Sequence, residues 1–242
     1  MRISVCMATF NGELFICNQI KSILMQLDKN DELIIIDDAS SDKTVQLIKN
    51  FNDSRIKLNV NVQNIGVVST FEEALRKVNG DIICLSDQDD IWMDGKLSFI
   101  RKFFRKNNID LIVHDAEVLI NNKLDEKSLF EIINSSRGFL RNLYSNTFTG
   151  CCMAFRCDLL KMALPIPKSK GVYHDAWIGL ISEIYWKKIS FISIPFVQYN
   201  RHENNLSSMS TRSLFKIIPE RISLIVHLSF RVISNLFKKL GD

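Results

Sequence analysis

The chain has 242 residues, enough for one large domain or for one domain with a helical extension. Hydrophobic residues make up 46% and charged residues 24%, which excludes an intrinsically disordered chain and is typical of a globular protein. The formal net charge of +4 is too small to indicate nucleic acid as a partner.

Cysteine usage and hydropathy indicate the compartment. The six cysteines form no C-x-x-C pair and lie in apolar segments, as expected of reduced thiols in a cytoplasmic protein. No signal peptide follows Arg2, and no run of about 20 apolar residues is long enough to span a membrane. We therefore expect a cytoplasmic protein.

The first part of the chain alternates two periodicities. Runs typical of buried strands occupy 3–7, 33–36, 55–60, 81–85 and 110–113. Helices with one apolar face are predicted at 14–27, 42–51, 70–78 and 96–106. Strands that alternate with helices imply right-handed crossovers. The predicted fold class is therefore α/β, with a mostly parallel sheet flanked by helices.

The second part of the chain is less regular. A hairpin is predicted around 121–122, further strands at 148–155 and 189–197, and a helix at 175–186. Residues 1–212 are expected to form one α/β domain.

The C-terminal segment, residues 213–242, is predicted to be a basic amphipathic helical tail. Apolar residues recur at helical spacing from Leu214 to Leu240, with basic residues between them. Two interpretations stay open: the helix packs on the domain, or residues 213–240 lie on an anionic membrane. The second would make the protein peripheral on the inner face of the cell membrane. Pro219 predicts that the helix starts there.

An acidic cluster follows the strand at 81–85. Asp87, Asp89 and Asp90 repel one another unless a cation lies among them. Carboxylate oxygens suit Mg²⁺ or Mn²⁺, with substrate phosphates completing the coordination shell. A solvated acidic turn is the alternative, but the buried strand before the cluster and Trp92 after it favour a metal site.

A second acidic pair, Asp37 and Asp38, ends the strand at 33–36. In an open α/β sheet, ligands bind outside the carboxyl ends of the strands. The pair serves either to cap the next helix or to accept a hydrogen bond from the imide N–H of uracil or thymine.

Four segments in order and spacing resemble the family 2 glycosyltransferases, inverting enzymes with the Rossmann-like GT-A fold for nucleotide-diphospho-sugars. They are 8–12 (A-T-F-N-G), 36–42 (I-D-D-A-S-S-D), 64–66 (N-I-G) and 85–92 (L-S-D-Q-D-D-I-W). The last is similar to segments of bacterial O-antigen, lipopolysaccharide and capsule enzymes, including rhamnosyltransferases. Ala8 replaces the usual proline of the family, and Ser86 stands where many members have aspartate.

The resemblance implies a role for particular residues. The base and ribose pocket of the donor would be lined by Thr9, Asn11, Glu13 and Asp38. Asp87 and Asp89 match the D-x-D motif, in which Asp89 meets the Mn²⁺ or Mg²⁺ ion and Asp87 lies beside both ion and nucleotide.

Two later segments also resemble family motifs. In 173–177 (Y-H-D-A-W) the resemblance makes Asp175 the general base. In 199–205 (Y-N-R-H-E-N-N) it makes His202 a further metal ligand or a contact of the diphosphate, although Arg201 is one position later than in the motif. The acceptor side of the pocket is expected to hold Trp92, Asp90, His174 and Trp177.

The implied reaction moves a sugar from dTDP-rhamnose or a UDP-hexose to a hydroxyl of a lipid-linked saccharide in bacterial surface polysaccharide synthesis. Residues 1–115 would form the nucleotide-sugar-binding half and 116–212 the acceptor-side half. A sugar-1-phosphate nucleotidyltransferase would need a glycine-rich basic loop, yet 9–13 has neither lysine nor arginine. A phosphoacceptor receiver domain would end near residue 125 and leave Asp175 without a role.

Overall fold

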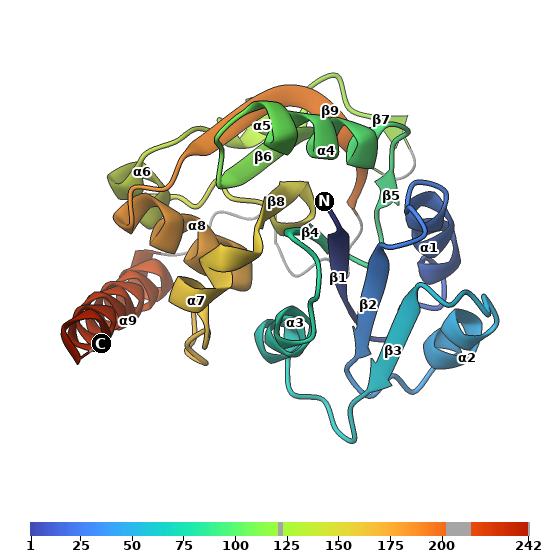
Figure 1. The fold of residues 1–242 in the computed structure, drawn as a ribbon, viewed down its shortest axis with the longest axis horizontal. Helices are drawn as coiled ribbons and strands as arrows, with labels where there is room; N and C mark the ends of the chain where they lie inside the picture. The colour runs from blue at the N-terminus through green and yellow to red at the C-terminus, as the bar shows by residue number, and fades with distance from the viewer. Residues whose placement is uncertain (121–122, 202–213, 242) are drawn as a thin grey trace.

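A computed structural model of the chain describes residues 1–120, 123–201 and 214–241 (Figure 1). Within them, one nine-stranded sheet has the order β3-β2-β1-β4-β8-β6-β9-β5, and β7 pairs with β6. The strands are β1 (Ile3–Thr9), β2 (Glu32–Asp37), β3 (Ile56–Val60), β4 (Ile82–Ser86), β5 (Ile91–Trp92), β6 (Leu111–Ile120), β7 (Lys123–Leu124), β8 (Met153–Arg156) and β9 (Ile189–Arg201). The α-helices are α1 (Ile16–Leu24), α2 (Thr44–Lys49), α3 (Val67–Arg76), α4 (Lys96–Lys106), α5 (Leu129–Ile133), α6 (Phe139–Tyr144), α7 (Leu160–Ala163), α8 (His174–Ile184) and α9 (Leu214–Gly241).

The first four strands form one parallel part of the sheet, and β6 and β9 form a second parallel pair. β1 pairs in parallel with β2 and β4, so that Thr9 lies opposite Asp37, and Met7 lies opposite Ser86. Continuous apolar runs such as 33–36 are fully buried because α1 and α2 lie on one side of these strands and α3 on the other (Figure 1). The carboxyl ends of β1, β2 and β4 consequently reach one edge of the sheet.

The remaining strands make the sheet mixed and curled. β8 pairs antiparallel with both β4 and β6, and β5 pairs antiparallel with β9. The strand predicted at 148–155 starts only at Met153, because Gly150–Cys152 form a 3₁₀ turn that leads into β8. The expectation of a mostly parallel sheet therefore holds for β1 to β4 and for the pair β6 and β9, while β8 reverses direction in the middle of the sheet.

Helix α9 lies at the edge of the molecule beside α7 and α8 (Figure 1). It begins at Leu214, so the prediction of a start at Pro219 is wrong, and the proline lies inside the helix. Leu224 and Leu228 are buried, whereas a second face exposes large apolar side chains. These are Ile218, Ile222, Ile225, Val226, Phe230, Ile233 and Phe237. None of the helices in the described ranges has both the length and the hydropathy needed to cross a bilayer.

Candidate active site

Asp37, at the end of β2, joins two loops at the carboxyl edge of the sheet. One carboxylate oxygen accepts the Ser40 N–H at 2.8 Å. The other oxygen accepts the Ser40 hydroxyl at 2.6 Å and the Thr9 hydroxyl at 2.9 Å. Asp37 and Thr9 are both buried, so the first acid of the pair is a fixed part of the strand ends.

Asp38 holds the N-I-G segment. Its Oδ1 accepts the Ile65 N–H at 2.9 Å and the Asn61 amide at 3.1 Å, and its Oδ2 accepts the Gly66 N–H at 2.9 Å. A carboxylate has about four acceptor positions, so roughly one is left for a nucleobase N–H. The hydrogen bonds to Ile65 and Gly66 explain why the motif at 36–42, which contains Asp38, occurs together with the N-I-G motif at 64–66.

Asn11 and Glu13 connect the loop after β1 with the loop after β2. Asn11 has φ +47 and accepts the Ser41 N–H at 2.9 Å on its side-chain oxygen. Glu13 accepts the Lys43 N–H at 3.0 Å. The structure therefore brings the predicted donor residues Thr9, Asn11, Glu13 and Asp38 to the same pair of loops.

The acidic loop after β4 concentrates negative charge. Oxygen atoms of Asp87 and Asp90 and the sulfur of Cys151 all lie within 4.8 Å of one another. Burial raises the pKa of Asp87 to about 7, and the carboxylates of Asp89 and Asp175 add to this rise. Burial also raises the pKa of Asp90 well above its usual range, with Asp89 the next cause.

These residues fit a divalent cation. Asp90 is 1% exposed; its Oδ1 accepts the Asn200 N–H at 3.1 Å, while Oδ2 has no hydrogen-bond partner in the described part of the chain. An unpartnered buried carboxylate oxygen beside other carboxylates is the environment that a hard cation such as Mg²⁺ or Mn²⁺ neutralises. The Cys151 thiol is a softer ligand, so the carboxylates are the better donors.

Two of the expected assignments around this cluster change. Asp90, expected on the acceptor side, has its carboxylate in the cluster itself. Trp92, also expected on the acceptor side, is only 2% exposed. Its ring covers the buried Lys96, whose Nζ atom lies 3.9 Å from the ring centroid. The same Nζ donates a hydrogen bond to the Cys151 carbonyl at 2.9 Å. Trp92 therefore packs beneath the loop and does not line an open pocket. His202, predicted as a metal ligand, lies outside the described residues.

Asp175 lies in the first turn of α8 and faces the same region. Its carboxylate accepts the Ala176 N–H at 2.6 Å and is also bonded by the Gly150 backbone. Burial raises the pKa of Asp175 to about 6 in spite of these bonds. Its charge raises the pKa of Asp87, so the structure brings the predicted base close to the predicted metal loop.

His174 and Trp177 frame this end of α8 in different ways. His174 stacks on Phe71 with ring centroids 3.9 Å apart, and burial lowers the pKa of its imidazole to about 3, so the ring is neutral near pH 7. A side chain at Gly150 would put its Cβ 3.1 Å from the His174 Nε2 atom. Trp177 is fully buried and donates to the Ala163 carbonyl at 2.7 Å, so it belongs to the core. The expectation that Trp177 lines an acceptor pocket is corrected by this burial.

A row of polar side chains on α1 supports the acidic loop, and sequence reasoning did not find it. The Gln19 amide donates to the Asp87 carbonyl at 3.0 Å and to the Ser86 hydroxyl at 2.8 Å. Ser22, further along the helix, accepts the Trp92 N–H at 3.0 Å, and Gln26, just after the end of α1, donates to the Met93 carbonyl at 3.0 Å. Polar residues at helical spacing on an otherwise apolar face were the available signal.

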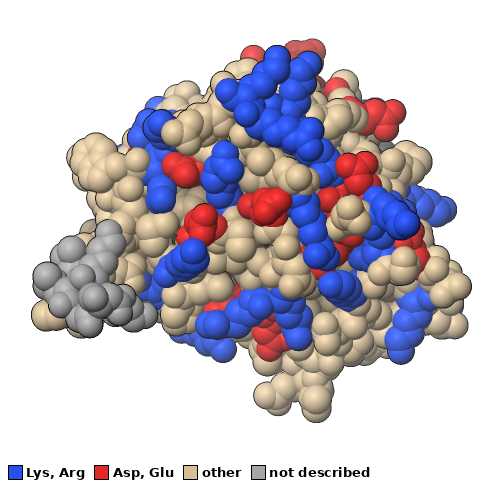
Figure 2. Space-filling view, viewed as in Figure 1, with Lys and Arg blue, Asp and Glu red and all other residues tan. Residues whose placement is uncertain are grey.

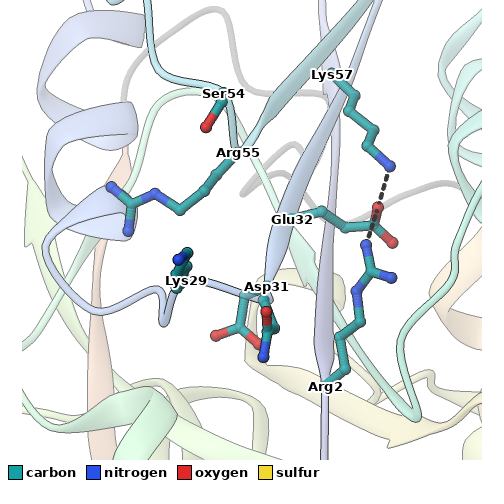
Figure 3. Close-up of a pocket in the computed structure, with 8 residues that line it drawn as sticks. Arg2, Lys29, Asp31, Glu32, Ser54, Arg55 and Lys57 are labelled. Atoms are coloured by element: carbon teal, nitrogen blue, oxygen red, sulfur yellow. Dashed lines mark hydrogen bonds and ion pairs between the residues drawn. The ribbon is translucent and has the colours of Figure 1, made fainter.

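A cavity of about 480 Å³ opens at the opposite edge of the sheet, near the amino ends of β1 to β3 (Figure 3). Arg2 and Lys57 both pair with the buried Glu32, at 3.0 and 2.6 Å. Burial opposes ionisation of Glu32, but hydrogen bonds from Lys57, Ser4 and Asn79 and the charge of Arg2 lower its pKa to about 2. Charges of both signs are likewise interspersed over the face in Figure 2. Charges that are paired in this way stabilise the fold. The residues that line this cavity therefore do not indicate a second reactive site.

The fold is similar to that of solved glycosyltransferases. TarS 1–349 of S. aureus, solved in complex with UDP-GlcNAc, superposes with a TM-score of 0.72 at 21% identity, over 88% of this chain and 62% of that one. The mannosyltransferase PcManGT of Pyrobaculum calidifontis, solved with GDP-Man and Mn²⁺, gives a TM-score of 0.59 at 20% identity, over 80% and 55% of the two chains. This chain thus spans about three fifths of each, and the likeness shows a shared GT-A fold.

Curated relatives and a family profile agree with that fold. The UDP-Glc:alpha-D-GlcNAc-diphosphoundecaprenol beta-1,3-glucosyltransferase WfgD of Escherichia coli is 29% identical over 216 residues, 88% of this chain and 82% of the relative. The dTDP-rhamnosyl transferase RfbG of Shigella flexneri is 28% identical over 256 residues, 98% and 85% of the two chains. The profile of glycosyl transferase family 2 matches residues 4–163. The chain therefore belongs to glycosyl transferase family 2 and is a glycosyltransferase.

Proposed function

We propose that the chain transfers a sugar from a nucleotide diphosphate to a saccharide hydroxyl with inversion, using a divalent cation and Asp175 as general base. The observation that carries this proposal is the closeness of a half-buried carboxylate of raised pKa, Asp175, to the carboxylate cluster at Asp87 and Asp90. A base beside a charge-neutralising site is the arrangement that a direct displacement at an anomeric carbon requires.

The donor-binding role is assigned to the loops after β1 and β2. Thr9, Asn11, Glu13 and Asp38 would contact the base and ribose, and residues 1–115 would form the donor half. The candidates for the donor are dTDP-rhamnose and a UDP-hexose, which is consistent with the relatives named for dTDP-rhamnosyl and UDP-Glc transfer.

The metal-binding role is assigned to Asp87 and Asp89, with the unpartnered oxygen of Asp90 beside them and His202 as a further candidate. A bound Mn²⁺ or Mg²⁺ ion supplies positive charge that neutralises the departing diphosphate. The chain contributes the carboxylates, and α1 fixes the loop backbone through Gln19 and Ser22.

Asp175 is assigned the proton transfer. The N–H groups of Ala176 and Gly150 orient its carboxylate, and burial keeps its pKa close to 6. An ionised Asp175 then accepts the proton of the acceptor hydroxyl as that oxygen attacks the anomeric carbon. A single base without a nucleophilic carboxylate gives inversion.

The acceptor is proposed to be a lipid-linked saccharide, bound by residues 116–212, in bacterial surface polysaccharide synthesis. Support comes from the relative whose named acceptor is a diphosphoundecaprenol-linked sugar. The exposed apolar face of α9 would rest on the inner face of the cell membrane. The excess of basic residues in the sequence of the tail would favour anionic lipid.

Metal removal tests the proposal. Excess EDTA should abolish transfer from UDP- or dTDP-sugars, and Mn²⁺ or Mg²⁺ should restore it, because the carboxylate loop cannot neutralise a diphosphate by itself. Asp89→Ala should lose metal-dependent nucleotide binding and remain folded. The control is Asp158→Ala, which removes an exposed acid from the turn after β8 and should behave as the intact chain. Full activity in EDTA would exclude the metal-dependent mechanism.

A further inference from the structure

Gln88, the middle residue of the acidic loop, bonds to the donor loop through its side chain. Its Oε1 accepts the Phe10 N–H at 2.9 Å, and its Nε2 donates to the Phe10 carbonyl at 3.1 Å. Backbone pairing between β1 and β4 ends at Met7 and Ser86. The Gln88 amide therefore continues the contact between the two strands beyond the point where their backbones separate.

The space around this contact is closed by Gly12. A Cβ atom on Gly12 would lie 2.3 Å from the Gln88 Oε1 atom, so a side chain there would displace the amide. The φ angle of Gly12 is not in the left-handed region, and alanine is compatible with its backbone. Room for Gln88 is thus the structural reason for glycine at this position.

The two ends of this bridge carry the residues assigned to the donor. Asp87 and Asp89 flank Gln88 on one loop, while Asn11 and Glu13 lie one and three residues after Phe10 on the other. We propose that Gln88 is a positioning residue that fixes the spacing between the donor loop and the carboxylate loop. The inference rests on the proposed function, since that spacing matters only when one ligand spans both loops.

The chemistry of the bridge restricts which side chains can replace Gln88. A primary amide offers one acceptor and one donor in a single plane, which matches an N–H and a C=O of one residue. Glutamate keeps the acceptor and loses the donor, and methionine keeps the length and loses both. The far side of the loop stays attached through the bond between Gln19 and the Asp87 carbonyl, so these variants should fold.

Donor binding and hydrogen exchange measure the effect of Gln88→Met. After loss of two neutral hydrogen bonds, the loops should have the binding-competent spacing in about a tenth of the molecules. The Kd for UDP or dTDP with Mn²⁺, and the KM for the donor, should therefore each rise about tenfold. At donor saturation kcat should stay within about twofold. The Phe10 N–H should exchange faster with deuterium, because its partner is gone. Gln46→Met, at an exposed position on α2, should change none of these values.

A double-substitution cycle gives the sharper test. Gly12→Ala should reproduce the tenfold loss of donor affinity in the intact chain and have no further effect in a Gln88→Ala background, where the methyl group meets no amide. Equal losses in both backgrounds, or unchanged donor affinity in Gln88→Met, would overturn the positioning role. Unchanged exchange at Phe10 would overturn the bridge itself. If the intact chain binds neither UDP nor dTDP, the proposed function is refuted. The hydrogen-exchange comparison at Phe10 needs no nucleotide, so it still tests the bridge in that case.

Discussion

The proposal that Asp175 is the general base rests on its position and on its raised pKa. Its carboxylate is half-buried at the start of α8, is held by the Ala176 N–H, and has a pKa raised by burial to about 6. A base is most useful when its pKa lies near the working pH, because it is then ionised and still able to hold a proton. The neighbouring His174 is neutral at this pH and adds no competing charge.

The pH dependence of turnover follows from that pKa. Protonated Asp175 cannot accept a proton, so kcat should rise with pH through a midpoint near 6 and level off above about 7. A pH series of kcat at saturating donor and metal measures the midpoint. The acid limb should disappear in Asp175→Asn, whose residual activity has no such group to titrate. A limb that persists unchanged in this variant would assign the titration to another residue.

Sequence motifs predicted the positions of the candidate site residues in the fold better than they predicted the contacts of those residues. The spacing predicted that Thr9, Asp38 and Asp87 end neighbouring strands, because parallel strands expose their carboxyl ends at one edge. It could not predict that three hydrogen bonds from residues 61–66 occupy most of the acceptor positions of Asp38. It also could not predict that Trp177 faces the core although it is two residues from Asp175. Residues two apart on a helix point in different directions, and only packing decides which of them is buried.

At the scale of elements, α9 carries two unlike faces. Leu224 and Leu228 pack on the domain, and Arg231 donates to the carbonyls of Met162 and Leu164, whereas Phe230 is 67% exposed. The inner face therefore agrees with the interpretation that the helix packs on the domain, and the membrane interpretation stays a proposal for the exposed face. The inner face is structural, and the outer face is the part proposed to meet lipid.

Substitutions on the two faces should separate these roles. Leu228→Ala removes a buried side chain and should lower the free energy of unfolding by about 2–4 kcal/mol. Phe230→Ser changes an exposed position and should alter it by no more than about 0.5 kcal/mol, but should weaken binding to anionic vesicles. Urea unfolding and vesicle sedimentation report the two effects. Equal vesicle binding by Phe230→Ser and the intact chain would contradict the membrane proposal and leave the packing of α9 unaffected.

Periodic elements were predictable and short ones were not. The helix predicted at 96–106 has the bounds of α4, and the fully apolar run 33–36 lies inside β2. The two-residue strand β5 and the helices α5, α6 and α7 were missed, since a few residues carry no measurable period. β5 is a strand only because β9 pairs with it, and that contact is long-range.

At the scale of the whole molecule, insertion of β8 between β4 and β6 creates the site. It places Gly150 and Cys151, which precede β8, next to the acidic loop after β4, and Gly150 in turn contacts Asp175 of α8. A phosphoacceptor receiver domain has no such continuation beyond residue 125. The division into a donor half at 1–115 and an acceptor half at 116–212 stays a proposal, because β8 and β9 connect both parts into one sheet.

The opposite edge of the sheet should contribute stability that depends on pH. The pKa of Glu32 is lowered to about 2 in the folded chain, so its ion pairs stabilise the fold fully above an unfolded pKa of about 4.3 and lose this effect as pH falls through 2. Because Arg2 and Lys57 are partly solvated, Glu32→Gln should cost about 2 kcal/mol at pH 7 and very little near pH 2. Chemical unfolding at both pH values measures this, with the exposed Glu126→Gln as the control. A cost that is independent of pH would contradict the role of the ion pairs.

The central claim is that Asp175 accepts the proton of the acceptor hydroxyl. Comparison of the intact chain with Asp175→Asn tests it most directly, with turnover and donor affinity measured on the same preparations. Asparagine keeps the size and most of the hydrogen bonding and removes the proton acceptor, so turnover should fall by about 10² or more while donor Kd stays within a few-fold. Turnover that survives while donor affinity falls would make Asp175 a binding residue and contradict the mechanism.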